Sequence, residues 1–335
     1  MSPIIVGGPY FDELEIGQIF DGAPAVTLTD GAAAAHQAIL GDRLRLALDR
    51  QLSREVTFAP AALAHPGLVT DIAIGQSTLA THHVKANLFY RGLRFLSWPH
   101  IGDTITTTTE VVGLRENSRK PGRAPTGLAA LRMRTVDDRG QTVLDFYRCA
   151  MLPLAAGAAA TGRDDDLSAI GEPDAAAAGE AGDQNCPDWD LLRYREQVPG
   201  EHFTADLAGR RLLTSADVVT GATELARLTL NIAATHHDAR VSGDRRLVYG
   251  GHTIGLALSQ ATRALPNIVT VLGWQSCDHT GPVHEGDTLS SEIEIEHAWP
   301  LRSGGALALR SIVHSHDSDG SSRPVLDWRY TVLMA

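Results

Sequence analysis

The chain has few of the residues that mark disulfide-stapled, zinc-binding or membrane-spanning proteins. Its 335 residues include only three cysteines, Cys149, Cys186 and Cys277, which lie far apart and form no Cys-x-x-Cys pair. This spacing argues against a disulfide framework and against a zinc site. The sequence also lacks an uninterrupted apolar run of about 18 residues, which a transmembrane helix needs. We therefore expect a protein that neither binds a metal nor crosses a membrane.

Basic residues are scarce as well. The chain has 29 Lys and Arg against 40 Asp and Glu, which gives a formal net charge of -11. Nucleic-acid phosphates need clustered basic side chains, so nucleic acid is not an expected partner, and any anionic ligand must find a local basic patch. The N-terminus, MSPIIVGGPYFDELEIG, has acids where a secretory signal has a basic start and an apolar core. A cytoplasmic location is expected.

The sequence does contain an internal repeat. A chain of this length suits two domains of roughly 150 residues each. Three short stretches recur in the same order at offsets of 182 to 184 residues: EIGQIF (15–20) and VPGEHF (198–203), GDT (102–104) and GDT (286–288), VLDFYR (143–148) and VLDWRY (325–330). The chain is therefore interpreted as two copies of one unit.

The segment between the copies, 155–188, is poor in large apolar residues and rich in Ala, Gly and Asp. Such a composition buries too little surface to offset the entropy cost of ordering. We predict a linker at 155–188 between domains 1–154 and 189–335. An alternative is that its alanine runs form a short exposed helix.

Each copy shows the pattern of an α+β unit. Apolar or small side chains alternate with polar ones after each GDT turn, which predicts half-buried strands. Two further strand-like runs follow in each copy, separated by the turn sequences DDRGQ and DSDGSS, so each copy should end as an antiparallel meander. Ahead of the strands, apolar residues recur at helical spacing: Leu68, Ile72, Leu79 and Ile254, Leu258, Leu265. We expect one central helix wrapped by a sheet in each copy.

These features resemble a known family. The initial FDELEIGQIF, the glycine-containing turn into a central helix, the strand before a P-x-x-GDT turn and the closing VLDF and VLDW strands are similar to the hotdog fold of MaoC-like enoyl-CoA hydratases and dehydratases. The tandem arrangement resembles the double-hotdog members. The stretches LTLNIAATHHD, RRLVYGGHTIGLALSQATRALPN and SCDHTGPVHEGDTL resemble the mesaconyl-CoA (2-methylfumaryl-CoA) hydratase branch.

Hydration of a 2-enoyl thioester needs a group that deprotonates or orients the attacking water, a proton for the α carbon, and donors for the thioester oxygen. The resemblance implies an Asp followed, after four residues, by a His. The second copy has this spacing at Asn231 and His236, with an amide in place of the acid. We expect His236 to carry the proton transfer and Asn231 to position water or substrate. His237 and Asp238 are the alternatives if the alignment shifts by one residue.

In the first copy the acid is kept as Asp42, but the position of the histidine is Ala47. This half is expected to shape the acyl pocket rather than to complete a dyad. An alternative is that Asp42 reaches the second site across the junction and restores a carboxylate there.

The donors for the thioester oxygen are expected where the chain turns into the second central helix. Gly251 matches Gly67 by the repeat offset, and free amides and the positive end of the helix dipole gather at such a start. We predict that Gly250 and Gly251 form the oxyanion site, lined by Tyr249 or His252. Arg245 and Arg246, just before the turn, are candidates for contacts to coenzyme A phosphates or a substrate carboxylate.

The resemblance thus implies a double-hotdog hydro-lyase that reversibly hydrates a short, branched or dicarboxylic 2-enoyl-CoA. No metal and no cofactor beyond the coenzyme A of the substrate is expected, and the chain is expected to form a homodimer. The alternatives are a hotdog acyl-CoA thioesterase and a non-catalytic acyl-CoA-binding partner subunit.

Overall fold

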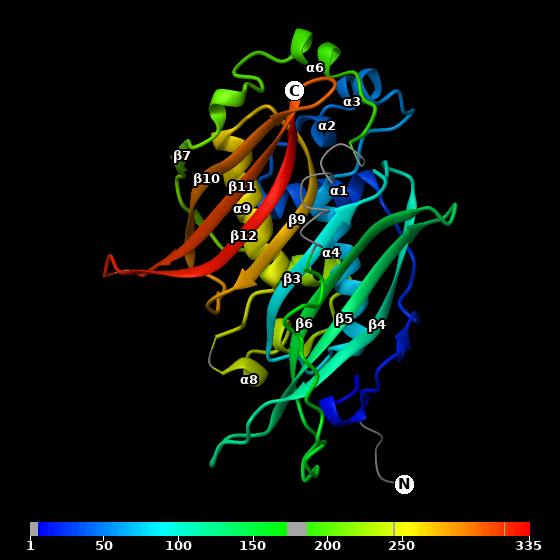
Figure 1. The fold of residues 1–335 in the computed structure, drawn as a ribbon, viewed down its shortest axis with the longest axis vertical. Coiled ribbons are helices and arrows are strands. Elements are labelled where there is room, and N and C mark those ends of the chain that lie inside the picture. Colours follow the sequence, from blue (N-terminus) through cyan, green and yellow to red (C-terminus); the bar gives the residue numbers. More distant parts are fainter. Residues whose placement is uncertain (1–5, 173–185, 244, 318) are drawn as a thin grey trace.

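The computed structural model describes residues 6–172, 186–243, 245–317 and 319–335. Two helix-and-sheet units lie side by side, and their strands join in one twelve-stranded antiparallel sheet (Figure 1). The α+β tandem hotdog architecture predicted from the repeat is confirmed. Among the described residues, no helix has the length and apolar character that crossing a bilayer requires.

The N-terminal unit places short helices and one central helix ahead of its long strands. Its elements are η1 (Phe11–Glu13), β1 (Ile19–Phe20), β2 (Val26–Thr27), α1 (Asp30–Leu40), α2 (Arg45–Leu48), α3 (Arg50–Thr57), α4 (Pro66–Gln76), η2 (Ser77–Ala80), β3 (Ala86–Phe95), β4 (Thr104–Glu116), β5 (Thr126–Asp137) and β6 (Thr142–Pro153).

The C-terminal unit repeats this order. Its elements are α6 (Leu191–Gln197), η3 (Ala205–Leu207), β7 (Arg211–Leu213), β8 (Asp217–Val218), α7 (Ala222–Leu228), η4 (Ala234–His236), α8 (Ala239–Ser242), α9 (Gly250–Ala264), β9 (Ile268–His279), β10 (Thr288–Pro300), β11 (Gly305–His316) and β12 (Ser322–Met334).

The two central helices, α4 and α9, are buried along almost their whole lengths, as expected for helices enclosed by a sheet. The predicted alternation after the GDT turns is also confirmed, because the alternate residues of β4 and β10 from Ile105 and Leu289 onward are buried. The turns themselves match: Gly102 and Gly286 have φ values of 107° and 90°, which favour glycine. The repeat in sequence is therefore a repeat in structure.

Strands β3 and β9 join the two units. They pair antiparallel from Phe89 opposite Asp278 to Arg94 opposite Gly273. On the inner side, the rings of Tyr90 and Trp274 meet edge to face with centroids 5.8 Å apart. One hydrophobic cluster therefore contains residues of both halves, and any cavity at the junction draws its walls from both copies.

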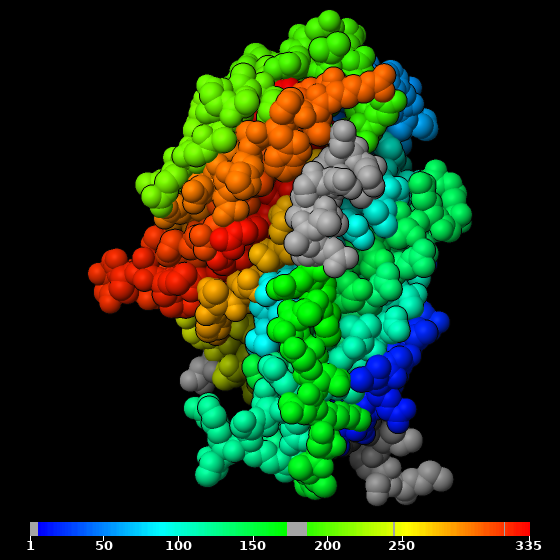
Figure 2. All heavy atoms as spheres, in the orientation of Figure 1, coloured from blue at the N-terminus to red at the C-terminus, as the bar shows by residue number. Residues whose placement is uncertain are grey.

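Part of the predicted linker packs on the N-terminal sheet. Leu167 is 3% exposed, and it packs with Leu128, Ala130 and Cys149 on the outer side of β5 and β6. Figure 2 shows the described part of this segment, residues 155–172, in green on the strands of the N-terminal unit. Residues 173–185, which include the alanine run, lie outside the described residues, so the linker as a unit stays a prediction.

Candidate functional site

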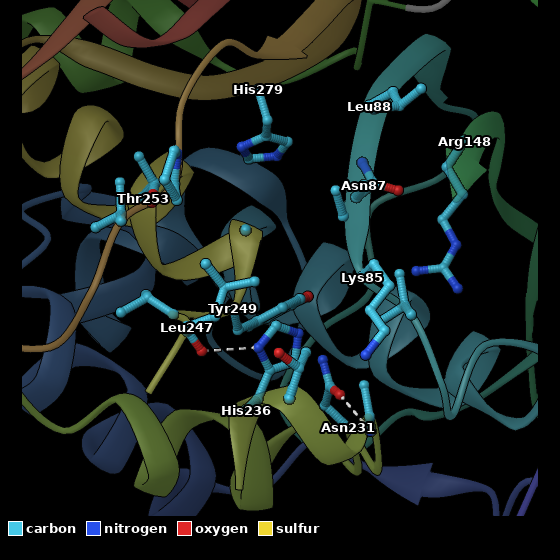
Figure 3. Close-up of a pocket in the computed structure, with 18 of the residues that line it drawn as sticks. Lys85, Asn87, Leu88, Arg148, Asn231, His236, Leu247, Tyr249, Thr253 and His279 are labelled. Atoms are coloured by element: carbon cyan, nitrogen blue, oxygen red, sulfur yellow. Dashed lines mark hydrogen bonds between the residues drawn. The ribbon is translucent and has the colours of Figure 1, made fainter. Parts of the chain in front are cut away.

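A cavity of about 240 Å³ lies at the junction of the two units (Figure 3). Its walls come from the start of β3, the end of β6, the segment from Asn231 to His236, the start of α9 and the loop after β9. Lys85 and Pro282 are exposed at its mouth. Three other lining side chains are buried, with 1 to 3% exposure: Tyr90, Arg148 and Tyr249.

His236 lies at the end of η4 and lines this cavity. Its Nδ1 is 3.0 Å from the carbonyl oxygen of Leu247. Because a carbonyl can only accept, Nδ1 carries the hydrogen and Nε2 keeps a lone pair. Burial lowers the pKa of His236 to about 4, so the imidazole is neutral at pH 7. The side chain is therefore available as a proton acceptor.

Asn231 also lines the cavity and is the structural counterpart of Asp42. Each follows a residue in the left-handed region, Leu230 (φ 59°) and Gly41 (φ 69°) respectively. Each accepts a hydrogen bond from the amide two residues on, at 3.0 Å for Asn231 and 2.7 Å for Asp42. Since the Asn231 side-chain oxygen is engaged in this turn, its amide nitrogen is the group left to donate toward a ligand.

The two alternatives beside His236 do not line the cavity. His237 donates from Nε2 to the backbone oxygen of Asn231 at 2.6 Å, and so it braces the loop. Asp238 accepts from the amide of Arg240 at the start of α8 and forms an ion pair with its side chain. Of His236, His237 and Asp238, only His236 lines the cavity together with Asn231.

The two glycines that begin α9 have different roles. Gly250 lines the cavity, and a Cβ on it would lie 2.7 Å from Nε2 of His279. Gly251 instead faces α4, where a Cβ would lie 2.1 Å from Oδ1 of Asp71. Gly250 therefore borders the site as predicted. Gly251 does not line the cavity, and its lack of a side chain permits the close packing of the two central helices.

The start of α9 differs from the start of α4 in its capping. In α4, Nδ1 of His65 accepts from the amide of Gly67 at 3.0 Å. In α9 the corresponding cap residue is Tyr249, and its side chain makes no cap hydrogen bond. The first amides of a helix have no acceptor within the helix. In α9 the amide of His252 donates to the Tyr249 carbonyl at 3.0 Å, which leaves those of Gly250 and Gly251 for a ligand, whereas the matching corner in the N-terminal unit is occupied by its own histidine.

Tyr249 and His252 were both candidates to line this corner, and only Tyr249 does so. The Tyr249 hydroxyl donates to Oδ1 of Asp71 at 3.2 Å, and burial holds the pKa of this phenol well above its usual range. His252 does not line the cavity and is 0% exposed. Neither ring nitrogen of His252 has a hydrogen-bond partner among the described residues.

Three other predicted candidates also lie outside the cavity wall. Asp42 is 1% exposed, with Oδ1 2.9 Å from Nε2 of His65, so it does not restore a carboxylate to the second half. Arg245 and Arg246 form ion pairs with Asp287 and Glu285. Their guanidinium groups are thus already paired with acids of the loop before β10.

Several cavity residues were not predicted from the sequence. His279 contributes a buried Nε2 that has no partner among the described residues. Burial lowers the pKa of His279 to about 4. Lys85, Tyr90 and Arg148 come from β3 and β6 or their ends, in the half expected only to shape the pocket. The sequence offers one signal for Arg148. The repeat motif VLDFYR ends in arginine, whereas its counterpart VLDWRY ends in tyrosine.

The fold and this cavity define a double-hotdog protein with one open site between its halves. The chain is 62% identical to a conserved protein from Mycobacterium tuberculosis that has a double hotdog fold and is essential for bacterial survival during infection (TM-score 0.93, 99% of this chain and 100% of that chain). A structure of a MaoC domain protein dehydratase from Chloroflexus aurantiacus is 26% identical (TM-score 0.81, 99% of each chain).

Two characterised relatives match along most of their lengths. One is the beta-methylmalyl-CoA dehydratase of Chloroflexus aurantiacus, 29% identical over 98% of this chain and 97% of that protein. The other is the mesaconyl-CoA hydratase of Cereibacter sphaeroides, 28% identical over 93% of this chain and 91% of that protein. No family model matches the sequence. The chain belongs to the MaoC-like double-hotdog family of hydratases and dehydratases.

Proposed function

We propose that the protein is a hydro-lyase that reversibly hydrates a short 2-enoyl-CoA, of which mesaconyl-CoA is the candidate that the relatives' names supply. One observation carries the proposal: a neutral imidazole, His236, faces the same cavity as the uncapped start of α9. A base and a set of amide donors at one acyl group are what addition of water to an enoyl thioester requires.

The reaction can be followed with the residues present. The thioester oxygen accepts from the amide at Gly250, where the α9 dipole favours the negative charge that grows as the enolate forms. Nε2 of His236 takes a proton from the water whose oxygen bonds to the β carbon. The imidazolium then returns this proton to the α carbon, so water is added without loss or gain of atoms. Asn231 orients the water through its amide nitrogen.

The size and charge of the cavity suit the two ends of such a substrate. A volume of about 240 Å³ holds a short acyl group, while the nucleotide of coenzyme A stays outside. The exposed ammonium of Lys85 at the mouth can meet the coenzyme A phosphates. The proposed reaction needs proton transfer and hydrogen-bond donors, and it needs no metal and no cofactor beyond the coenzyme A of the substrate. A cytoplasmic location and a homodimer are part of the proposal, and analytical ultracentrifugation tests the second.

The proposal is tested by mixing the protein separately with mesaconyl-CoA and crotonyl-CoA and following the conjugated enoyl absorbance. Loss of this absorbance with no release of free thiol is expected. Steady release of coenzyme A thiol would identify a thioesterase instead. Tight binding of both thioesters with no turnover would identify a non-catalytic acyl-CoA-binding subunit.

A further inference from the structure

A buried guanidinium lines the cavity without an acidic partner among the described residues. Arg148 extends from β6 and is 3% exposed. Its hydrogen bonds go to neutral oxygens: the Ser77 carbonyl at 3.4 Å, the Thr81 hydroxyl and the Tyr90 hydroxyl. Its Nε has no partner among the described residues. Figure 3 shows the side chain reaching into the site from the wall that also carries Asn87 and Lys85.

Two arginines of the same sheet have the acidic partner that Arg148 lacks. Arg132 on β5 and Arg310 on β11 each have a carboxylate on the neighbouring strand, Asp145 and Asp327 respectively, at 2.6 Å and 2.7 Å. Both of those pairs are partly exposed, whereas Arg148 is buried. Burying a cation without an anion is costly unless a ligand supplies the missing charge.

The repeat shows that the fold itself does not require an arginine here. Arg148 lies opposite Tyr90 on β3, and its counterpart Tyr330 lies opposite Trp274 on β9. Tyr330 is fully buried and uncharged, and its hydroxyl is 3.2 Å from that of Ser311. A neutral side chain thus fills the equivalent position on β12, which does not line this cavity. The charge occurs only where the position faces the cavity.

The place of Arg148 also selects between the anions of an acyl-CoA. The phosphates belong to the nucleotide, which must lie outside the mouth near Lys85 and Pro282. Arg148 is instead a buried part of the cavity wall, like Tyr90 and Tyr249, so the acyl group inside the cavity is the part of the substrate that we expect it to contact. A guanidinium can hold a carboxylate through two parallel hydrogen bonds.

We infer that Arg148 binds a carboxylate at the far end of the acyl chain, so that the substrate class is the coenzyme A monothioester of a short unsaturated dicarboxylic acid. This inference rests on the proposed function. Mesaconyl-CoA is one member of the class, and the four-carbon fumaryl-CoA is its simplest member.

The first test measures binding without turnover. Succinyl-CoA and butyryl-CoA have saturated four-carbon chains that end in a carboxylate and in a methyl group, and neither can be hydrated. Calorimetry should show succinyl-CoA binding the wild-type protein about 10-fold or more tightly, in line with a hydrogen-bonded charge pair. Arg148→Gln should abolish this preference. Arg134→Gln, which removes an exposed arginine of β5, should retain it.

The second test compares hydration of fumaryl-CoA and crotonyl-CoA. A site built around a substrate carboxylate should discriminate against the methyl analogue by about 100-fold or more in kcat/KM. Arg148→Gln should reduce fumaryl-CoA hydration by a similar factor and reduce crotonyl-CoA hydration by a much smaller factor. Arg148→Lys should restore part of the fumaryl-CoA activity, because it keeps the charge without the planar fork.

The outcomes separate the inference from the function. Equal binding of succinyl-CoA and butyryl-CoA by the wild type, or an equal loss of both in Arg148→Gln, overturns the inference. A loss in that variant of affinity for coenzyme A alone would assign Arg148 to the phosphates and overturn it as well. Absence of hydration with either enoyl thioester, together with a preserved preference for succinyl-CoA, contradicts the proposed function and supports the carboxylate site.

Discussion

His236 and His237 are adjacent in sequence but have different surroundings. His236 lines the cavity with Nε2 free to accept a proton, whereas His237 is bonded to the backbone of Asn231. His236→Ala should reduce kcat by about 100- to 10,000-fold, the usual contribution of a general base. His237→Ala should retain most of the activity. Steady-state kinetics of both variants, with circular dichroism to confirm folding, check this; the reverse result moves the catalytic assignment to His237.

The low pKa of His236 also predicts the acid limb of the pH profile. The base form requires a neutral ring, and burial lowers the pKa of this group to about 4 in the free protein. Because kcat/KM reports ionisations of the free enzyme, it should stay level from pH 7 down to about pH 5 and fall only below that. Initial rates over this range, with brief exposure to acid, measure the profile. A limb centred near the ordinary histidine pKa of about 6.5 would contradict it.

Buried histidines should also make the fold sensitive to acid. Burial lowers the pKa of His252 to about 4 from a value of 6.5. The unfolded chain therefore takes up protons that the native chain does not, so stability is full above pH 6.5 and is lost as the pH falls from there toward 4. His252→Leu removes this term and should flatten the dependence. Urea denaturation of both proteins at pH 7 and pH 5 tests this; equal pH dependence would contradict the prediction.

The amino-acid sequence alone predicted several individual residues of the site. His236, Asn231, Gly250 and Tyr249 follow from one motif and one turn, and all line the cavity. Arg148 was missed because its role depends on which face of β6 meets the open site. Alternation along a strand gives the two faces but does not say which of them borders a cavity.

Among the elements, the start of α9 performs two tasks with two glycines. Gly251→Ala would place a methyl group 2.1 Å from Asp71 Oδ1 and 2.5 Å from the Tyr249 ring, so it should destabilise the protein by about 1 to 3 kcal/mol. Gly250→Ala meets the side chain of His279 instead, so it should spare the fold and lower kcat by about 10-fold or more. Denaturation curves and kinetics of both variants separate the effects; equal destabilisation would contradict this division.

The helices and meander strands could be predicted because each has a local pattern. The spacing of Leu68 and Ile72 indicates α4, and the alternation from Ile105 indicates β4. The pairing of β3 with β9 has no such local signal. It depends on two strands that lie 184 residues apart in the repeat and meet only when both units have formed.

At the scale of the whole molecule, this pairing should make the two units unfold together. Gly273 on β9 faces the β3 backbone, and a Cβ there would lie 2.5 Å from the Leu93 carbonyl oxygen. Gly273→Ala should therefore lower the stability of the entire chain by about 1 to 3 kcal/mol. Gly31→Ala on α1, where a Cβ finds only ordinary contacts, is the control. Separate transitions seen by circular dichroism and tryptophan fluorescence would show that the units unfold independently.

Asp71 gives this union a further consequence. It belongs to α4, in the copy whose histidine position is Ala47, yet its carboxylate holds both His36 at 3.2 Å and the Tyr249 hydroxyl at 3.2 Å. The N-terminal copy, which lacks the catalytic histidine, thus supports the cavity wall to which the C-terminal copy contributes Tyr249. After duplication the sequences of the two copies could diverge, but not independently of one another. A substitution near Asp71 would alter the surroundings of Tyr249 in the other copy.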